Sequence, residues 1–415
     1  MKKAKIIAIL VAATASLTAT GIVAYSSSDV MSDKTIVIEH PTVDTVKPTE
    51  RMLQQTAAMA AHRSLEDSLD VDDNGRFIYP DYYAGDYIDE DGNLVICLTS
   101  EDTIENYQFL KDKHSCVEFK IVEYSYNELN DTIEDYYSSS EYQSEIVSSS
   151  IDVINNKAVF EVSEEMYKMK ADDISSKLSL EITDSNPQCC TIISGGEELV
   201  NKQNGNFWEP NYSCTVAANV VNSVGDEFLL TCGHKMDVGD KMYYNGTCIG
   251  SVHETHPPVN TFSSYGDYSL VKLKDNVHVT YTVYGVKNAV DSALDRLTYL
   301  HRPQYTIPVG AECFKFSRKF GYADFDIERT DQIAYNVEDQ NGNIMGNLYG
   351  MVKCEWISGN IQPGDSGSGI YYYCPDSSYE LLGVLSCINE DTNEVYFSPL
   401  SHLDDDYTIY TVETA

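Results

Sequence analysis

The sequence predicts a chain in two parts, a small α+β region followed by an all-β region that runs to the C-terminus. Up to about Thr183, runs with the alternation of strands take turns with segments of helical periodicity. From Ile192 onward helical patterns nearly vanish, and short β-rich runs recur between turn residues, as in CTVAANVV, EFLLTC, YSLVKL, GIYYY and ELLGVLSCI. Many short strands at this spacing are typical of a β-barrel or a β-sandwich.

The composition is that of a folded protein with an acidic surface. The 415 residues are 42% apolar and 11% aromatic, which is enough for packed cores in two or three domains. The net charge of −37 argues against binding to nucleic acid or to anionic membranes. We interpret the charge as a solvated surface, with calcium binding by carboxylates as the alternative.

The N-terminus has the pattern of a secretion signal, because MKKAK is followed by an apolar stretch from Ile6 to Ala24. Alanine and threonine dilute this stretch, which favours a cleaved signal over an uncleaved membrane anchor. We expect a signal peptide over 1–24, a secreted extracellular protein, and a polar tether over 25–70 with a short helix around Met52 to Leu69. In an exported chain, eleven cysteines indicate disulfides, and the odd number leaves at least one without an intramolecular partner.

The α+β region is expected over 71–190. Its first hairpin, GRFIYPDYYAGDYIDEDGNLVICLTS, has a turn at Asp91-Gly92-Asn93. Helices are expected over 101–112, 127–147 and 163–178, with strands in CVEFKIVEYSY and AVFEV. The segment from Asp184 to Thr191, with DSNPQCC at its centre, has the composition of a linker.

Three residues of the all-β region lie at predicted strand ends, and together they suggest an acyl-transfer site. His234 follows the strand FLLTC and a glycine, Asp267 precedes YSLVKL, and Ser366 lies in the glycine-rich loop PGDSGSG before GIYYY. Taken singly, each is better explained as a surface or turn residue. Taken together, they are the set that serine catalysis needs, since the hydroxyl requires a neutral histidine as base and the histidine requires an orienting carboxylate. The N–H groups of Gly364 and Ser366 would converge on the developing oxyanion.

LLTCGHK, GDYSL and PGDSGSG, in this order, resemble the three catalytic segments of chymotrypsin-fold serine proteases, above all the bacterial secreted branch of the α-lytic protease and streptogrisin type. TIISGGEEL, CTVAANV, ECFKFSRKFGYADFDI and LLGVLSC resemble further segments of that branch. The resemblance covers roughly Thr191 to Leu403. It implies that residues 191–415 form two six-stranded antiparallel β-barrels of the chymotrypsin-like class.

The resemblance also implies roles for individual residues. Ser366 would be the nucleophile, His234 the general base and acid, and Asp267 the orienting carboxylate, with Gly364 and Ser366 as the oxyanion hole. Asp365 would shape this loop, and Ser386 would lie near the buried carboxylate. The primary specificity pocket, with no strong charge, would be walled by Asn360, Ile361, Gln362, Leu385, Ser386 and Cys387.

The sequence departs from the family pattern around the cysteines. Cys232 precedes the Gly-His pair and Lys235 follows it, where the pattern has alanine and cysteine. A disulfide from Cys214 to Cys232 would staple the same two strands a few residues away. The usual cysteine shortly before the serine is absent, so the other pairings are not inherited, and Cys97 with Cys116 is only a guess for the front region.

The segments PDYYAGDYIDEDGNLVI and VEFKIVEYSYNEL resemble the pro-regions of α-lytic-type proteases, which help the protease to fold and then inhibit it. An all-β fold with distant contacts folds slowly and gains from such a template. The alternative is an independent binding domain. If the front region is a pro-region, processing should fall within 190–193.

We therefore expect a secreted serine endopeptidase made as a zymogen, with protein or peptide substrates and its own pro-region as partner. No cofactor and no metal is expected, and the protein should be a monomer. One rival is a catalytically inactive protease fold that binds partners at the cell surface, which the unusual TCGHK segment suggests. A second rival is a generic β-rich surface protein. HETH, from His253 to His256, is expected to be a loop rather than a metal site.

Overall fold

The structure is a computed structural model, and its contacts divide the chain into two compact units, residues 1–35 and 36–415. All residues described here lie in the second unit. They are 36–38, 49–72, 77–139, 145–170, 175–183, 188–189, 199–201, 212–234, 236–244, 247–259, 265–274, 277–279, 307–317, 321–339, 343–361, 365–373, 379–389, 392–403 and 407–409. The expected signal peptide lies outside these ranges.

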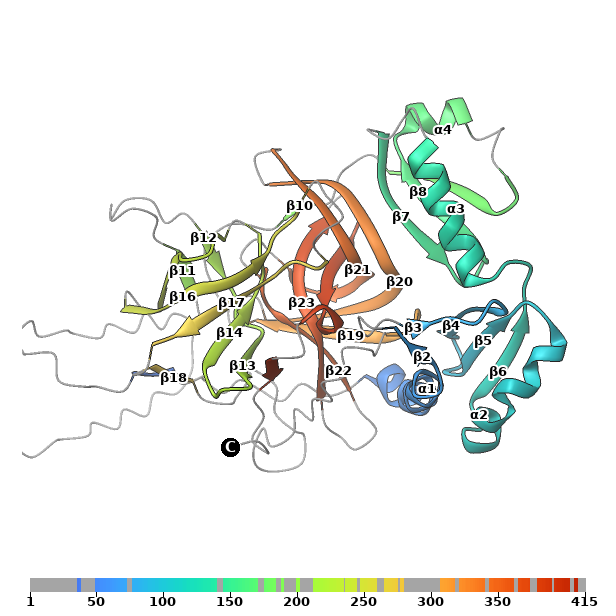
Figure 1. Ribbon diagram of the computed structural model, residues 1–415, viewed down its shortest axis with the longest axis horizontal. Helices are drawn as coiled ribbons and strands as arrows, with labels where there is room; N and C mark the ends of the chain where they lie inside the picture. The colour runs from blue at the N-terminus through green and yellow to red at the C-terminus, as the bar shows by residue number, and fades with distance from the viewer. Residues whose placement is uncertain are drawn as a thin grey trace, which may run out of the picture. The chain divides into compact units, whose positions relative to one another are not determined.

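The front domain, which comprises the described residues from 49 to 183, begins with a helix and a three-stranded sheet (Figure 1). The predicted hairpin is present, and Gly92 takes the positive φ of +80° at its turn. The expected helix over 101–112 is a 3₁₀ turn continued by a short α-helix. The elements are α1 (Glu50–Glu66), β2 (Asp70–Val71), β3 (Phe77–Ile78), β4 (Tyr83–Ile88), β5 (Leu94–Leu98), η1 (Glu101–Tyr107), α2 (Gln108–Lys113) and β6 (Val117–Ile121).

Helix α1 lies within the range expected to be a polar tether. Thr49 caps it, because its hydroxyl accepts a hydrogen bond from the Met52 N–H. Its buried residues include Met52, Met59 and Leu65, so this helix is part of the folded core rather than a tether.

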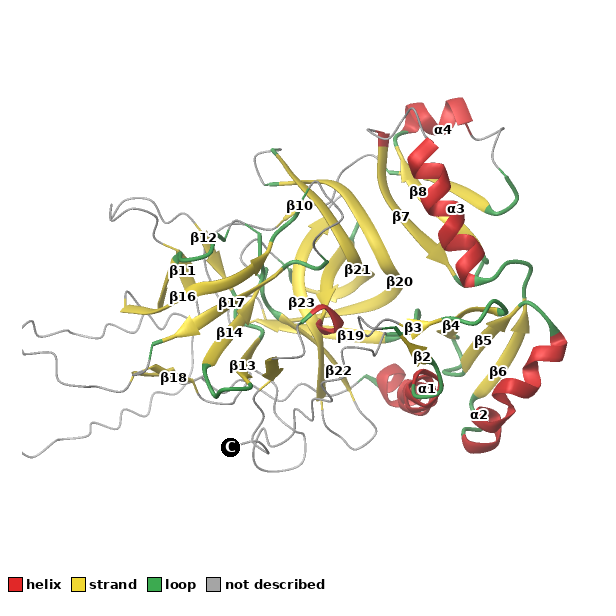
Figure 2. Ribbon diagram, viewed as in Figure 1, coloured by secondary structure: helices red, strands yellow, loops and turns green. Residues whose placement is uncertain are grey.

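The second half of the front domain is a three-stranded sheet with two helices. Two predicted helices are shorter than expected, because Ile146-Val147 and Leu178 are strand residues that pair with the strand between them. The elements are α3 (Tyr126–Ser139), β7 (Ile146–Asp152), β8 (Lys157–Val162), α4 (Glu164–Lys170) and β9 (Leu178–Ile182). Every α-helix in the described ranges lies before residue 171 (Figure 2).

The described residues that follow are all β, and they begin with an antiparallel eight-stranded sheet in the order β12-β11-β15-β16-β17-β14-β13-β25. Six strands were expected here. The count in the described residues is higher, in part because the C-terminal β25 adds itself beside β13. The strands are β11 (Leu199–Asn201), β12 (Tyr212–Cys214), β13 (Ala218–Asn222), β14 (Glu227–Thr231), β15 (Lys241–Tyr244), β16 (Thr247–His256), β17 (Tyr268–Leu273) and β25 (Tyr407–Ile409).

The following sheet contains a closed barrel of six strands, as expected. Its order is β19-β22-β23-β24-β21-β20, and β20 also pairs with β19, which closes the ring. The sheet continues from β20 into β7, β8 and β9 of the front domain. The strands are β19 (Glu312–Ser317), β20 (Gly321–Glu338), β21 (Ile344–Gly359), β22 (Gly369–Tyr373), β23 (Tyr379–Asn389) and β24 (Glu394–Pro399), followed by the 3₁₀ turn η4 (Leu400–His402).

Two short elements complete the description. Strand β1 (Ile36–Ile38) pairs in parallel with β18 (Val277–Val279). Strand β10 (Gln188–Cys189) pairs with both β20 and β23 of the barrel. None of the helices in the described ranges has the length and hydropathy that a membrane crossing requires.

Candidate active site

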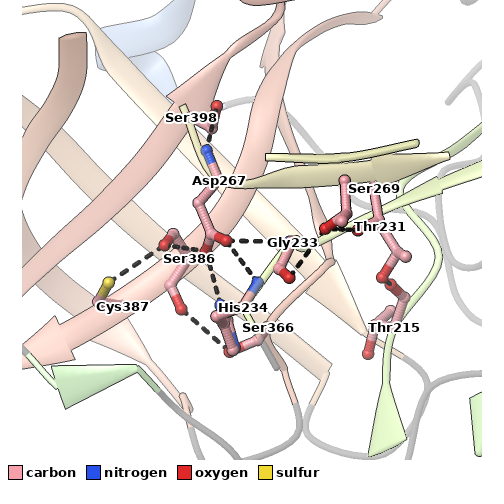
Figure 3. A network of polar contacts seen from close by, with 11 residues as sticks. Thr215, Thr231, Gly233, His234, Asp267, Ser269, Ser366, Ser386, Cys387 and Ser398 are labelled. Atoms are coloured by element: carbon pink, nitrogen blue, oxygen red, sulfur yellow. Dashed lines mark hydrogen bonds and ion pairs between the residues drawn. The ribbon is translucent and has the colours of Figure 1, made fainter. Parts of the chain in front are cut away.

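The structure brings His234 and Asp267 together, each next to a strand of the first sheet (Figure 3). His234 lies three residues beyond the end of β14, and Asp267 directly precedes β17. Both side chains are fully buried, and His234 Nδ1 donates to Asp267 Oδ2 over 2.6 Å. The other carboxylate oxygen, Oδ1, accepts from the backbone N–H groups of Gly233 at 2.9 Å and His234 at 2.7 Å. Asp267 therefore fixes both the loop and the ring of His234.

Two glycines make this approach possible. A Cβ on Gly233 would lie 2.5 Å from the carbonyl oxygen of His256, so no side chain fits directly before His234. Gly266 has a φ of +79°, and a Cβ there would lie 2.4 Å from Ser398 Oγ. These contacts explain why a glycine precedes both the histidine and the aspartate.

The closed barrel supplies two further partners of Asp267. The Ser386 hydroxyl, on β23, donates to Asp267 Oδ2, and the Asp267 N–H donates to Ser398 Oγ at 3.1 Å. Ser386 therefore lies beside the buried carboxylate, where the resemblance had put it. The carboxylate accepts four hydrogen bonds in all, which offset the cost of burying its charge.

Ser366 lies in the tight turn before β22, and its side chain is buried beside the same residues. Its hydroxyl donates to the carbonyl oxygen of Ser386 at 3.0 Å, and His234 Nε2 has no hydrogen-bond partner among the described residues. The turn depends on Gly367, which has a φ of +90° and whose added Cβ would lie 2.1 Å from the Thr215 carbonyl oxygen. The structure thus gathers all three predicted residues, with the serine hydroxyl directed to Ser386 O.

Asp365 has a structural partner that the sequence analysis missed. Lys315 Nζ, on β19, lies 2.5 Å from Asp365 Oδ2, and both side chains are completely buried. A lysine in an apolar strand, as in ECFKFS, signals a buried ion pair, because an unpaired charge is too costly inside a protein. This pair anchors the residue directly before Ser366.

The expected binding residues divide into a described and an undescribed group. Gln362 and Gly364 lie outside the described residues, so the structure gives no geometry for the expected oxyanion hole at Gly364. Ile361 is buried, whereas Asn360 is exposed. Leu385, Ser386 and Cys387 are all buried on β23.

The linker segment lies along this same strand. Strand β10 pairs antiparallel with β23, with Gln188 opposite Ile388 and Cys189 opposite Cys387. Gln188 also pairs with Glu338 at the end of β20. An extended segment of the chain is thus added as a strand next to Ser386, in the manner of peptides that bind by strand addition.

The cysteines form two close pairs within the described residues. The Cys214 thiol hydrogen-bonds that of Cys232, and this contact and burial raise the pKa of Cys232 well above its usual range. Burial and a hydrogen bond to Cys313 raise the pKa of Cys354 in the same way. The guess of Cys97 with Cys116 is wrong, because Cys97 lies opposite Lys120 on the neighbouring strand and Cys116 precedes Val117, opposite Leu94. The two cysteines are therefore offset by about four residues along neighbouring strands, which places their Cα atoms too far apart for a disulfide.

HETH is not a loop, as was expected, but the end of strand β16. His256 stacks on Tyr268, with ring centroids 4.3 Å apart, and its Nε2 lies 2.7 Å from Glu254 Oε1. The segment is held in the sheet because β16 pairs with β17 up to this residue. Its two histidines therefore have structural neighbours.

Residues 47–157 match the family model of the Pro-like N-terminal domain. No curated protein matches the chain. The structure is similar to Thermobifida fusca Protease A at 16% identity, with a TM-score of 0.36, over 52% of this chain and 97% of that one. It is similar to Nocardiopsis protease (17%, TM-score 0.35, 50% and 91%) and to Cellulomonas bogoriensis chymotrypsin (17%, TM-score 0.35, 52% and 98%).

The chain thus has a segment that matches the Pro-like N-terminal domain, followed by an all-β region that contains a closed six-stranded barrel. The family-model match agrees with the pro-region resemblance, and the sheets confirm the predicted order of an α+β part followed by an all-β part.

Proposed function

We propose that the chain is the precursor of an exported serine endopeptidase. The observation that carries this proposal is a buried network in which Asp267 binds His234 and the Ser386 hydroxyl, while the Ser386 carbonyl accepts from the Ser366 hydroxyl. Ser366 Oγ would attack the peptide carbonyl while His234 Nε2 takes its proton, and the same proton would pass to the leaving amine. Water would then hydrolyse the acyl-enzyme by the same route. Gly364 and Ser366 would supply the N–H donors for the oxyanion.

Two features support the change that the first step requires. The Ser366 hydroxyl bonds to Ser386 O, so it must turn about its Cα–Cβ bond to reach Nε2. His234 Nε2 is buried and unpaired among the described residues, so it is available to accept that proton. Activity should fall in acid, because a protonated imidazole takes no proton from serine.

The linker supports a zymogen. Because β10 already lies on β23 beside Ser386, the segment that follows Cys189 would enter the site as an internal substrate. Processing within residues 190–193 would cut the chain between the two parts. We place the signal at 1–24, the front domain from about 48 to 190, and the protease domain at 191–415. The start at 48 replaces 71, because α1 is part of the folded core. The processed enzyme would contain one copy of the chain and no cofactor.

A second candidate is an inactive protease fold that binds partners. It is favoured by the direction of the Ser366 hydroxyl, which bonds to Ser386 O and not to His234. The two proposals differ in whether Ser366 reacts. In both proposals, strand β23 would bind an extended peptide segment, as it pairs with β10 in the structure.

Fluorophosphonate labelling tests the choice. The chain without residues 1–24 would be prepared unchanged and as Ser366→Ala, and labels and N-termini would be read by mass spectrometry. Label on Ser366, with a new terminus within 190–193 that the alanine variant lacks, would support a self-processing protease. A folded chain that takes no label would favour the binding protein.

A further inference from the structure

Side chains of helix α1, in the front domain, pack into hydrophobic cores of both β-sheets of the following region. Met52 belongs to the core around the first sheet, together with Phe314 and Tyr371. Two or more turns further on, Met59 and Leu65 belong to a second core, which joins front-domain residues such as Ile96 to barrel residues such as Phe325. An amphipathic helix on a surface would bury its residues against one partner, whereas α1 fills space between several elements.

Polar groups at this contact are buried and mutually satisfied. Gln55 is 1% exposed, its Nε2 donates to the Gly310 carbonyl at 2.7 Å, and its Oε1 accepts from the Glu312 N–H at 2.8 Å. Arg63 forms an ion pair with Glu380 on β23, whose side chain is 8% exposed. If α1 dissociated, the Gly310 carbonyl, the Glu312 N–H and the Glu380 carboxylate would lose their partners and would lie in a partly apolar surface. Such losses are costly.

The same contact leads to the candidate active site. Glu312, which Gln55 holds, is the first residue of β19. Lys315 follows on this strand, and its ammonium pairs with Asp365, directly before Ser366. The path from Gln55 to the serine loop therefore runs through one strand and one buried ion pair.

We propose that the front domain stays bound after processing, as a permanent non-covalent subunit, and that Gln55 acts as a positioning residue for the Ser366 loop. The positioning role of Gln55 rests on the proposed protease function, whereas the retention of the front domain does not. Interfaces that continue a hydrophobic core are typical of obligate complexes. This differs from the expectation of a pro-region that only folds and then inhibits the enzyme.

Retention is tested in the Ser366→Ala chain, which cannot cut itself by the proposed route. A recognition sequence for an external site-specific protease is inserted within 184–187, the chain is cut, and the two fragments are run on size exclusion in 1 M NaCl. We expect them to elute together and to separate only in urea. Separate elution in salt alone would overturn retention.

The positioning role is tested with Ser366 intact, by comparing Gln55→Ala with Gln54→Ala, a substitution of the exposed glutamine one residue earlier. Thermal melting first shows that each variant folds, and Gln55→Met, which keeps the volume but lacks both hydrogen bonds, replaces Gln55→Ala if that variant does not. The maximal rate of fluorophosphonate labelling should fall about tenfold for Gln55→Ala, at unchanged inhibitor affinity, and stay constant for Gln54→Ala.

Equal maximal rates for the two variants, or a fall in affinity alone, would overturn the positioning role. No labelling even in the unchanged chain would overturn it too, together with the proposed protease activity. The size-exclusion result would still decide retention by itself.

Discussion

Ser386 connects the two halves of the candidate site at the scale of single residues. Its hydroxyl donates to Asp267, and its carbonyl accepts from Ser366. Only the hydroxyl depends on the side chain, so a substitution separates the two contacts.

Ser386→Ala should slow fluorophosphonate labelling of Ser366 about tenfold, because a hydrogen bond to a buried carboxylate is worth about 1.5–3 kcal/mol. Ser398→Ala is the matched control, since Ser398 only accepts from the Asp267 backbone and touches neither carboxylate oxygen in the described contacts. Its effect should be smaller. Equal rates for Ser386→Ala and the unchanged chain would show that the hydroxyl does not help to hold Asp267.

His62 in the front domain is a second buried histidine between carboxylates. Its Nδ1 lies 2.7 Å from Asp86 and its Nε2 lies 3.2 Å from Glu66. Burial by itself lowers the pKa of His62, but the two carboxylates outweigh burial and raise the pKa well above its ordinary value. A raised pKa in the folded state means that protonation stabilises the fold.

His62→Ala should lower the free energy of unfolding by about 3 kcal/mol at pH 6, because it breaks a buried charge pair. The difference in unfolding free energy between His62→Ala and the unchanged chain should have its full size below the unfolded pKa of histidine, about 6.5. It should shrink as the pH rises through the folded pKa of His62. Urea unfolding of Ser366→Ala chains, with and without the second change, at a series of pH values measures it. A gap of constant size from pH 6 to pH 10 would contradict the charged state of His62.

At the scale of elements, Cys214 at the end of β12 and Cys232 just after β14 are expected to form a disulfide. Their thiols are in contact, and both side chains are buried. After oxidation, peptide mapping without reductant should find the two cysteines linked. Cys214→Ser should then lower the free energy of unfolding by about 3 kcal/mol, the value for a loop of this size. Cys248→Ser, at a half-buried position, is the control. Separate thiols after oxidation would refute the disulfide.

The strand ends near the site were predictable from the sequence. The short helix expected around Met52 to Leu69 is present as α1, but it was assigned to a tether and not to the folded core. His234, Asp267 and Ser366 each stand beside a glycine at the end of a strand with an apolar pattern, so local signals mark them. In α1 the buried face includes the polar residues Gln55 and His62. Periodicity of apolar residues does not reveal such a face, because its partners lie far away in sequence, for example Gly310.

At the scale of the whole molecule, the site is assembled from distant segments. Ser386 reaches Asp267 across 119 residues, and Lys315 reaches Asp365 across 50. Motif order predicted which residues would meet, because the resemblance supplied it. It did not predict the partner of Lys315, since ECFKFS signals a buried cation but does not identify Asp365, which lies 50 residues away. Folds with so many distant contacts form slowly, so we expect a front domain that pairs β7 with β20 to help the following region to fold.

If the chain processes itself as proposed, the pairing of β10 with β23 predicts an intramolecular cut, and a backbone change tests this. Gln188→Pro removes an N–H and constrains the backbone where β10 meets both β20 and β23, so processing should slow at least about tenfold. Gln188→Ala keeps the N–H and should process at the unchanged rate. Fragment formation is followed by gel electrophoresis over a dilution series, and its rate constant should not depend on protein concentration. A rate that rises with concentration, or equal rates for the two variants, would mean that one molecule cuts another and that β10 does not present the linker.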